Sequence, residues 1–397
     1  MFWRFTATFF LILAAVQPCS ISPVRKLWSK DPGSASKLFA FEQNGRVGFI
    51  DATGKIVVQP EIEARIEDVG DFSDGLARVD HKGYIDESGR WIIRADYWWT
   101  EDFSDGLAIA LQEDAAQKGG YEGLVIDTTG KVVARVPARR TESFSEGLAI
   151  FEGPQKPGIR IFGREFVYLD FPGLKGFLDR TGNVIIPPAF ADVGPFVHGI
   201  ARAAQDGYCH LAMPDGGSQG TPTTGYPSSC GGAPRDAITP CQVGFINTKG
   251  RFVIEPRFES ARDFAEDLAA VRIGGLWGFI DRDGTTVIPP KFDEAQSFSE
   301  GLAAVRVDDE WGFIDKSGQV VIAPKFEEVE AFSDSMALAY RDHHPFYIDR
   351  SGQTRIPGPF LEATPFVDGL AAVLLSQTRV AYINHSGKIV FEYTRHT

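Results

Sequence analysis

Short apolar runs alternate with polar turns along almost the whole chain, and this alternation recurs with a period of about 34 residues, which indicates tandem repeats. One clear copy reads GFIDKSGQVVIAPKFEEVEAFSDSMALA from Gly312. Its first apolar strand ends in a turn from Asp315 to Gly318, where aspartate can accept backbone N–H bonds and glycine can take a positive φ. A strand rich in β-branched residues follows at 320–322, and the preceding copy has a further strand at 302–307. The pattern predicts three short strands per repeat and an all-β array.

Proline and phenylalanine mark the next part of each repeat. Pro324 is expected to end the second strand, because proline cannot donate a hydrogen bond to a ladder. Phe326 and Phe332 are single aromatic residues among acidic neighbours. We therefore expect both to be buried anchors of the core.

Each repeat has a part of constant length and a part of variable length. The spacing between the glycine positions of its two turns is the same in nearly every copy, as from Gly284 to Gly301. The remaining part varies from the short stretch between Gly75 and Gly83 to the long stretch between Gly199 and Gly244. A variable length indicates a surface loop. We therefore expect the insertions at 111–122, 152–175 and 205–242 to leave the same corner of neighbouring repeats.

The repeats resemble the WG repeat family, also called KWG repeats. The resemblance is carried by WGFID at 277–281 and 311–315, with the PKF and FSEGLA segments that follow. Several repeats depart from it, among them those with Val47, Lys175 and Val243 in place of the tryptophan, and the proline is lost in the second and third repeats. The resemblance implies a bacterial β-repeat protein, often associated with the cell envelope, and it brings no catalytic residues.

The fold prediction is a tandem array of eight to nine WG-type β-hairpin repeats. We favour an open, twisted solenoid over a closed, propeller-like ring, because a repeat of about 34 residues is short for a four-stranded blade. With 43% hydrophobic residues, the 397-residue chain can bury a large interior as a continuous seam through the stacked units.

The N-terminus predicts export. Arg4 precedes an apolar stretch at 5–16, which is too short to span a bilayer, so residues 1–19 are interpreted as a signal peptide. Cys19 raises the alternative of a lipoprotein signal with acylation at that cysteine. Residues 20–37 would form a linker and 38–397 the repeat domain. The protein would then be periplasmic, anchored to the outer membrane by lipid, or secreted.

Charge narrows the range of partners. The net charge of −13 disfavours nucleic acid and anionic membrane surfaces, because both are bound through concentrated Lys and Arg. We expect a monomer without a transmembrane helix in the mature chain, which binds a protein or glycan and uses no cofactor.

Three cysteines lie in the longest insertion. A hairpin extended across 205–242 would bring Cys209 near Cys241, so this pair is the preferred disulfide, with Cys230 leaving other pairings open. The alternative is a metal site that also uses His210, but no C-x-x-C spacing supports it, and no metal is expected.

Candidate binding residues lie where the repeats differ. Alignment places Tyr97 on the anchor position of Phe326, so Trp98 and Trp99 fall where other repeats have acidic residues, and at least one should point outward. Arg139 and Arg140 occupy the same two positions in the next repeat. Such a patch would suit a sugar or a carboxylate-bearing partner. The insertions add further candidates, namely Tyr168, Tyr208, His210 and Tyr226.

Catalysis has little support in the sequence. The aspartate of the first turn recurs in most repeats, with Asn247 and Asn384 in its place in two of them, which indicates an architectural role, and no H-E-x-x-H or P-loop motif is present. We therefore expect a non-catalytic binding or scaffolding protein of the envelope. The alternative is a carbohydrate-active hydrolase, which would need two carboxylates singled out by their environment.

Overall fold

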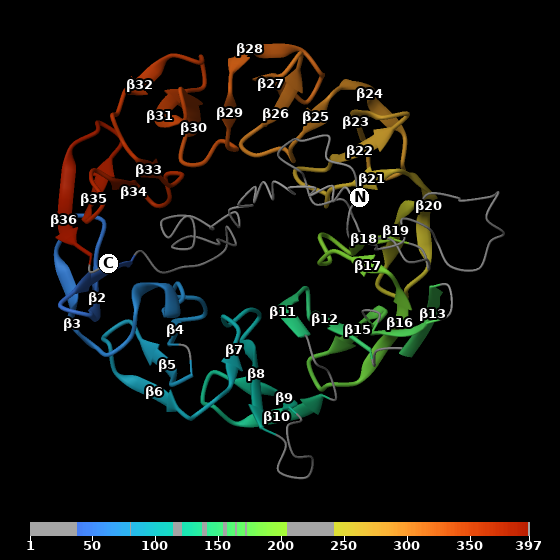
Figure 1. Cartoon of the computed structure of the whole chain (residues 1–397), viewed down its shortest axis with the longest axis horizontal. Coiled ribbons are helices and arrows are strands. Elements are labelled where there is room, and N and C mark those ends of the chain that lie inside the picture. The colour runs from blue at the N-terminus through green and yellow to red at the C-terminus, as the bar shows by residue number, and fades with distance from the viewer. Residues whose placement is uncertain are drawn as a thin grey trace, which may run out of the picture.

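The structure is a computed structural model that describes residues 38–79, 81–113, 121–136, 141–153, 157–162, 165–170, 173–204 and 242–395. These residues form nine antiparallel sheets arranged as blades around a closed ring (Figure 1), and the separate hairpin β13–β14. The open solenoid predicted from the sequence is therefore wrong, and the alternative of a propeller-like ring is correct. No helix among the described residues is long and apolar enough to cross a membrane.

The first four blades have the following strands. Blade 1 contains β1 (Phe39–Gln43), β2 (Arg46–Ile50) and β3 (Ile56–Ile62), and blade 2 contains β4 (Leu76–Val79), β5 (Gly83–Asp86) and β6 (Trp91–Arg94), with a short 3-10 helix (Ile66–Asp68) between them. Blade 3 contains β7 (Trp99–Thr100), β8 (Leu107–Glu113), β9 (Tyr121–Asp127) and β10 (Val132–Val136). Blade 4 contains β11 (Thr141–Ser145), β12 (Leu148–Glu152), β15 (Lys175–Asp179) and β16 (Val184–Phe190), and the hairpin of β13 (Pro157–Phe162) and β14 (Glu165–Asp170) is inserted within it.

The other five blades all have four strands. Blade 5 contains β17 (Asp192–Val193), β18 (Ile200–Ala204), β19 (Val243–Asn247) and β20 (Phe252–Phe258), and blade 6 contains β21 (Ser260–Ala261), β22 (Ala269–Ile273), β23 (Leu276–Ile280) and β24 (Thr286–Phe292). Blade 7 contains β25 (Glu294–Ala295), β26 (Leu302–Val307), β27 (Glu310–Asp315) and β28 (Val320–Phe326), and blade 8 contains β29 (Glu328–Val329), β30 (Met336–Arg341), β31 (His344–Asp349) and β32 (Thr354–Ile356). Blade 9 contains β33 (Glu362–Ala363), β34 (Leu370–Leu374), β35 (Arg379–Asn384) and β36 (Ile389–Thr394).

So short a repeat suffices for a four-stranded blade because its innermost strand is very short. In blade 7 the two-residue β25 lies at the inner edge of the ring and β28 at the outer edge (Figure 1). Asp308 and Asp309, both with positive φ, close the tight turn between β26 and β27. A repeat of about 34 residues is therefore long enough for a four-stranded blade, and the reason given for favouring the solenoid was wrong.

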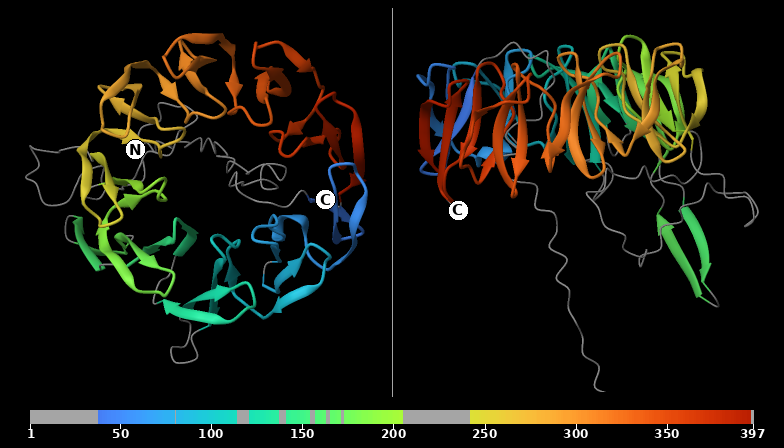
Figure 2. Two further views of the ribbon diagram at one scale, coloured as in Figure 1. Left: turned by 180° about the vertical axis from the view of Figure 1, so that it is seen from behind. Right: turned by 90° about the horizontal axis from the view of Figure 1, so that it is seen from above.

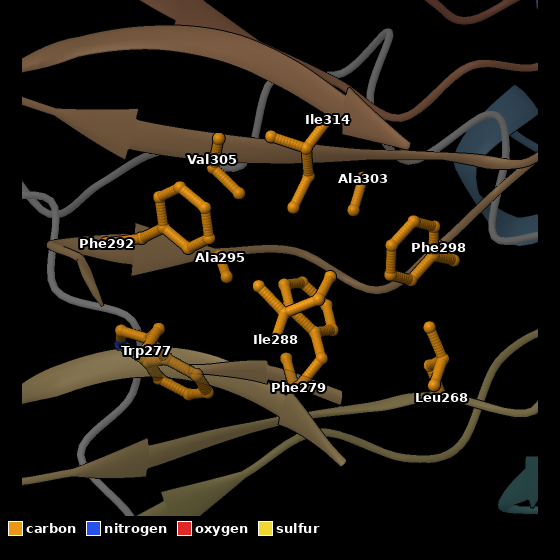
Figure 3. Close-up of a cluster of buried hydrophobic side chains, with 11 residues drawn as sticks. Leu268, Trp277, Phe279, Ile288, Phe292, Ala295, Phe298, Ala303, Val305 and Ile314 are labelled. Atoms are coloured by element: carbon orange, nitrogen blue, oxygen red, sulfur yellow. The ribbon is translucent and has the colours of Figure 1, made fainter. Parts of the chain in front are cut away.

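The core lies between blades rather than within them. Figure 3 shows one such cluster, in which Phe279 of blade 6 packs against Phe298 of blade 7 with the rings tilted and 4.9 Å between their centroids. Phe326 and Phe332 are buried in the next interface, as predicted. Each blade therefore buries its faces against its two neighbours, which is the general condition for a repeat array.

The seam between blades 9 and 1 is packed like the other interfaces. Phe41 meets Phe391 at 4.8 Å between centroids, and the Tyr382 hydroxyl donates a hydrogen bond to the Ala40 carbonyl oxygen at 2.5 Å. The corresponding Tyr347 hydroxyl of blade 8 donates to Thr364 O in blade 9. Within the described residues, neither seam blade contains a strand from the other end of the chain. Side-chain packing thus closes the ring without strand exchange.

The glycine of the WG motif permits a bulge in the outer strand. Trp311 pairs with Phe326 and Phe313 with Ile322, so residues 323–325 lie opposite the single residue Gly312. A Cβ atom on Gly312 would lie 2.5 Å from the Ile322 carbonyl oxygen. Because β28 continues through Pro324 to Phe326, the prediction that this proline ends the strand is wrong. An outer edge strand tolerates proline, because no further strand pairs with its outer side and no backbone N–H donor is needed there.

The predicted D-x-x-G turns form as expected. In blade 7 the Asp315 carboxylate accepts hydrogen bonds from the backbone N–H groups of Ser317 and Gln319, and Gly318 has a φ of +81°. Asn384 makes the same backbone contacts in blade 9, so a neutral amide also supports the turn. The repeated aspartates are therefore turn residues.

These turns predict a loss of stability in acid. Hydrogen bonds lower the pKa of six turn aspartates below the ordinary value of 3.8, namely Asp51, Asp86, Asp127, Asp179, Asp315 and Asp349. Although burial opposes it, hydrogen bonds from Ser88 and Arg90 lower the pKa of Asp86 to about 2. A lowered folded-state pKa contributes stability above the ordinary pKa, and that contribution is lost as the pH falls towards the lowered value.

We expect the free energy of unfolding, measured with urea, to fall between about pH 4 and pH 2. A variant with asparagine at all six turn positions should show a flatter profile, since Asn247 and Asn384 already support the turn without titrating. Glu101 and Asp263, whose pKa values are raised, contribute with the opposite sign. A profile equally steep in the parent and the variant would contradict this account.

Candidate functional site

Three insertions leave the same end of consecutive blades, as their spacing predicts. Their stems are the hairpins between the second and third strands of blades 3, 4 and 5, where Glu113 pairs with Tyr121, Glu152 with Lys175 and Ala204 with Val243. The hairpin β13–β14 projects from this side of the ring (Figure 2). We call this side the insertion face. The D-x-x-G turns lie at the opposite ends of the strands.

An exposed aromatic patch lies at the first of these stems. It consists of Trp98, Trp99 and Tyr121, which are 49%, 41% and 41% exposed. The ring centroids of Trp98 and Tyr121 are 4.4 Å apart at an angle of 40°. Both tryptophans therefore point outward, and Tyr97 beside them is buried in the anchor position predicted for it.

Polar groups from two blades border the aromatic patch. The Trp99 indole Nε1 donates to Glu101 Oε1 at 3.0 Å, and the Arg78 guanidinium of blade 2 lies 6.0 Å from the Trp99 ring. Arg78 Nε in turn donates to Asp102 Oδ1 at 2.9 Å. The patch thus spans the junction of blades 2 and 3 at the inner edge of the ring.

Glu101 is partly buried and lies near charges of both signs. Burial raises the pKa of Glu101, and the neighbouring carboxylates Asp102 and Glu142 raise it further, against the opposing effects of Trp99 and Arg78. Proton uptake by Glu101 is therefore easier than for an ordinary glutamate.

Acidic residues at the position equivalent to Trp98 stabilise a hairpin turn in other blades. In blade 8 the Glu327 carboxylate accepts hydrogen bonds from the Asp342 and His343 N–H groups of the tight hairpin turn. In blade 3 that turn is replaced by the insertion, and Trp98 packs on Tyr121 at its stem. The loss of a turn-capping acid and the gain of an aromatic residue therefore occur together.

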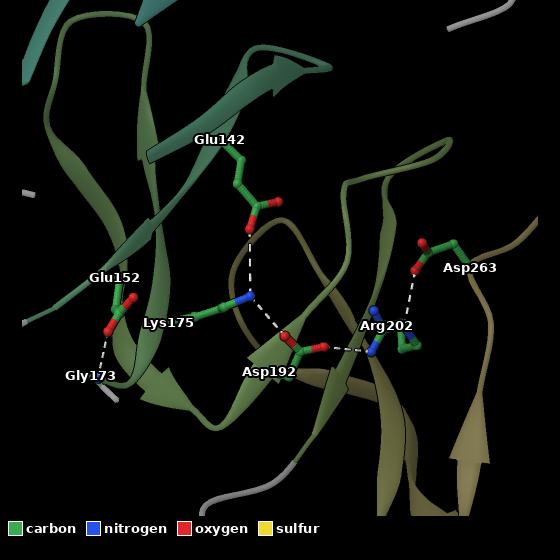
Figure 4. Close-up of polar contacts among 7 residues, drawn as sticks. All are labelled: Glu142, Glu152, Gly173, Lys175, Asp192, Arg202 and Asp263. Atoms are coloured by element: carbon green, nitrogen blue, oxygen red, sulfur yellow. Dashed lines mark hydrogen bonds and ion pairs between the residues drawn. The ribbon is translucent and has the colours of Figure 1, made fainter. Parts of the chain in front are cut away.

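A network of charged residues continues along the inner edge of blades 4 to 6 (Figure 4). Asp192 accepts from Lys175 Nζ and from Arg202 Nη1, both at 2.8 Å, and Arg202 Nε reaches Asp263 at 3.2 Å. Although burial opposes it, the contacts with Asp192 raise the pKa of Lys175. Lys175 occupies the tryptophan position of its WG motif. The network ties three blades together, which gives it a structural role.

A further depression of about 530 Å³ lies between the inner strands of blades 7, 8 and 9. Gln296, Glu328, Glu330 and Thr364 are among its lining residues. No aromatic side chain occurs in the lining that the structure describes, in contrast to the patch at blades 2 and 3.

Several predicted site residues lie outside the described residues, namely Cys19, Arg139, Arg140, Tyr208, Cys209, His210, Tyr226 and Cys241. Tyr168 belongs to β14, where it pairs with Ile159 of β13. Within the described ranges, no group of three or more His, Cys, Asp or Glu residues could hold a metal ion.

Sequence reasoning missed Arg78, Glu101 and Tyr121. A signal for Arg78 was present, because it faces Gly70 in the segment before β4, where a Cβ atom would collide with the Arg78–Asp102 pair. The same combination recurs as Arg202, Gly194 and Asp263 in blades 5 and 6. An arginine opposite a glycine, with an aspartate before the next anchor phenylalanine, predicts an ion pair between blades.

The fold is a repeat β-propeller. This scaffold, with an exposed aromatic patch, is consistent with a non-catalytic binding protein. The WG-containing-repeat family matches residues 48–81, 83–114, 176–209, 244–277, 277–311, 311–342 and 346–376. The chain belongs to this family, as the resemblance implied. Among curated proteins no sequence matches the chain.

One solved structure shows the same fold at low sequence identity, and a second is less similar. A eukaryotic initiation factor is similar with a TM-score of 0.55 and 13% identity, covering 91% of this chain and 96% of its own. BamB from Moraxella catarrhalis gives a TM-score of 0.40 and 12% identity, covering 81% of this chain and 94% of its own. The first likeness shows the fold alone.

Proposed function

We propose that this protein is a non-catalytic binding or scaffolding protein of the bacterial cell envelope, which holds a protein or glycan partner on its insertion face. The observation that carries the proposal is the meeting of three insertion stems and the aromatic patch at one end of blades 3 to 5. Exposed aromatic residues at a site of loop insertions are typical of recognition surfaces on rigid scaffolds.

The location in the envelope rests on the N-terminal sequence. Arg4 and the apolar stretch at 5–16 have the form of an export signal, and Cys19 follows directly. Acylation at Cys19 would tether the ring through residues 20–37. A monomeric ring held in this way presents its insertion face to a partner without needing a second subunit.

The absence of a catalytic role is part of the proposal. Its support is that the abundant aspartates are turn residues, each held by backbone N–H groups of its own turn. No observation on the described residues specifically favours the alternative, a carbohydrate-active hydrolase.

The test is a comparison of the parent with a variant that lacks the longest insertion. Residues 205–242 would be replaced by Val-Asp-Asp-Glu, the sequence that closes the corresponding hairpin of blade 7. Because Ala204 already pairs with Val243, the shortened hairpin should leave the blade intact. We expect crosslinked capture from envelope extracts by the parent and its loss from the variant at an unchanged melting temperature. Equal capture by both proteins, or none by either, would refute the proposed role of this insertion.

A further inference from the structure

We propose that the aromatic patch docks a basic segment of a protein partner, with a lysine or arginine side chain placed over the Trp98 and Trp99 rings and a carboxylate of Glu101 beside it. This inference rests on the proposed binding function and assigns the chemistry of the partner.

The aromatic rings are available and held in place. Tyr121 supports Trp98 from one side, and the hydrogen bond from Nε1 to Glu101 fixes the orientation of Trp99. Both indoles remain more than two-fifths exposed. Tryptophan gives the strongest attraction of any side chain to a cation above its ring. A fixed, exposed pair of indoles is therefore a preorganised platform for a cationic group.

Charge complementarity selects a cation over an anion or a neutral group. Two arginines near the patch already have acidic partners, since Arg78 contacts Asp102 and Arg135 contacts Glu122. Burial raises the pKa of Glu101, the Trp99 hydrogen bond and Arg78 lower it, and the carboxylates of Asp102 and Glu142 raise it. A ligand carboxylate placed beside these three acidic side chains would be repelled, whereas an ammonium or guanidinium group would be attracted.

Acidic residues recur on the inner strands of the following blades, at Glu142, Asp192, Glu294, Glu328 and Glu362. Lys175 and Arg202 neutralise part of this charge, because both already contact Asp192. The chain as a whole carries a net charge of −13, which favours the approach of such a partner.

The test uses a defined probe and variants of the whole protein. The probe is a fluorescent peptide in which arginine alternates with glycine and serine, compared with its citrulline counterpart by fluorescence anisotropy at physiological salt. We expect Trp99→Ala and the double variant Trp98→Ala/Trp99→Ala to weaken binding of the arginine peptide by about tenfold or more. Glu101→Gln should weaken it by about threefold, and the citrulline peptide should bind about tenfold less tightly than the arginine peptide.

Glu330→Gln provides the matched control. Glu330 holds the same backbone position in blade 8 as Glu101 in blade 3, but no tryptophan pair accompanies it. This variant removes the same charge and should change the affinity by less than about twofold. The melting temperature of each variant is measured to check folding. We expect it to be unchanged, because the replaced tryptophans are exposed.

Three outcomes would overturn the inference. These are unchanged binding of the arginine peptide by Trp99→Ala, equal affinity for the citrulline peptide, and a loss in Glu330→Gln as large as in Glu101→Gln. If the arginine peptide does not bind the parent, but a neutral chitooligosaccharide binds the parent and not Trp99→Ala, the patch is a glycan site instead. In that case, insertion-dependent capture of a partner would still support the proposed function, so the two failures are distinguishable.

Discussion

Replacing Gly312 by alanine is expected to destabilise the ring by about 3 kcal/mol, as measured by urea unfolding. The added Cβ atom would lie 2.5 Å from the Ile322 carbonyl oxygen and 2.6 Å from the Pro324 nitrogen. Both are backbone atoms of the neighbouring strand, so no side-chain rotation relieves the contact. The bulge at residues 323–325 would have to be rebuilt, and the burial of Phe326 would suffer with it.

Blade 9 provides the control for this substitution. It has Ala381 at the glycine position, and there Tyr382 pairs with Phe391, Ala381 with Glu392 and Val380 with Tyr393, one residue to one. Alanine is thus accepted where no bulge lies opposite. Ala381→Gly should cost no more than about 1 kcal/mol, the usual penalty for glycine in a regular element. If Gly312→Ala cost as little, the bulge would not be the reason for the glycine.

Replacing Asp192 by alanine is expected to cost about 2 kcal/mol of unfolding free energy. The carboxylate joins Lys175 to Arg202, and the side chains of Asp192 and Arg202 are only 17% and 13% exposed. Its removal leaves two cations on one acidic partner each, Glu142 at 3.5 Å and Asp263 at 3.2 Å. Partial solvation keeps the expected loss below that of a fully buried pair.

An exposed ion pair serves as the comparison. Asp309, whose side chain is 99% exposed, lies 3.8 Å from Arg306. Asp309→Asn should change the free energy of unfolding by less than about 0.5 kcal/mol. The cost of Asp192→Ala should also persist at high salt, because buried pairs are less screened than exposed ones. Similar small costs for both variants would show that the network contributes little to holding blades 4 to 6 together.

Local features of the repeat could be predicted from the sequence because they depend on neighbouring residues. The turn at Asp315, the buried anchors Phe326 and Phe332, and the common exit of the insertions all follow from spacing and residue type. Closure of the ring could not be predicted in the same way. It depends on the angle between successive blades, which is set by packing such as Phe279 against Phe298 across the interface. The four-stranded blade was missed because β25 has only two residues and leaves no periodic pattern.

The candidate site was predictable only where alignment without gaps was available. Trp98 and Trp99 were found because they replace acids at a fixed register position. Tyr121 lies next to an insertion, where alignment fails, and Glu101 resembles many other acids of the chain. The importance of Glu101 comes from the Trp99 hydrogen bond and from neighbours such as Glu142, which are distant in sequence.

No strand is exchanged at the seam within residues 38–395 as far as the structure describes them, and this has a consequence for how such rings can change. Each blade is one continuous stretch of chain, and the Phe41–Phe391 contact at the seam is of the same kind as the contacts elsewhere around the ring. Duplication or deletion of one repeat unit would therefore add or remove a whole blade without rethreading the chain. The diameter of the ring can thus vary through simple changes in repeat number, while the ends of the chain still meet at an ordinary interface.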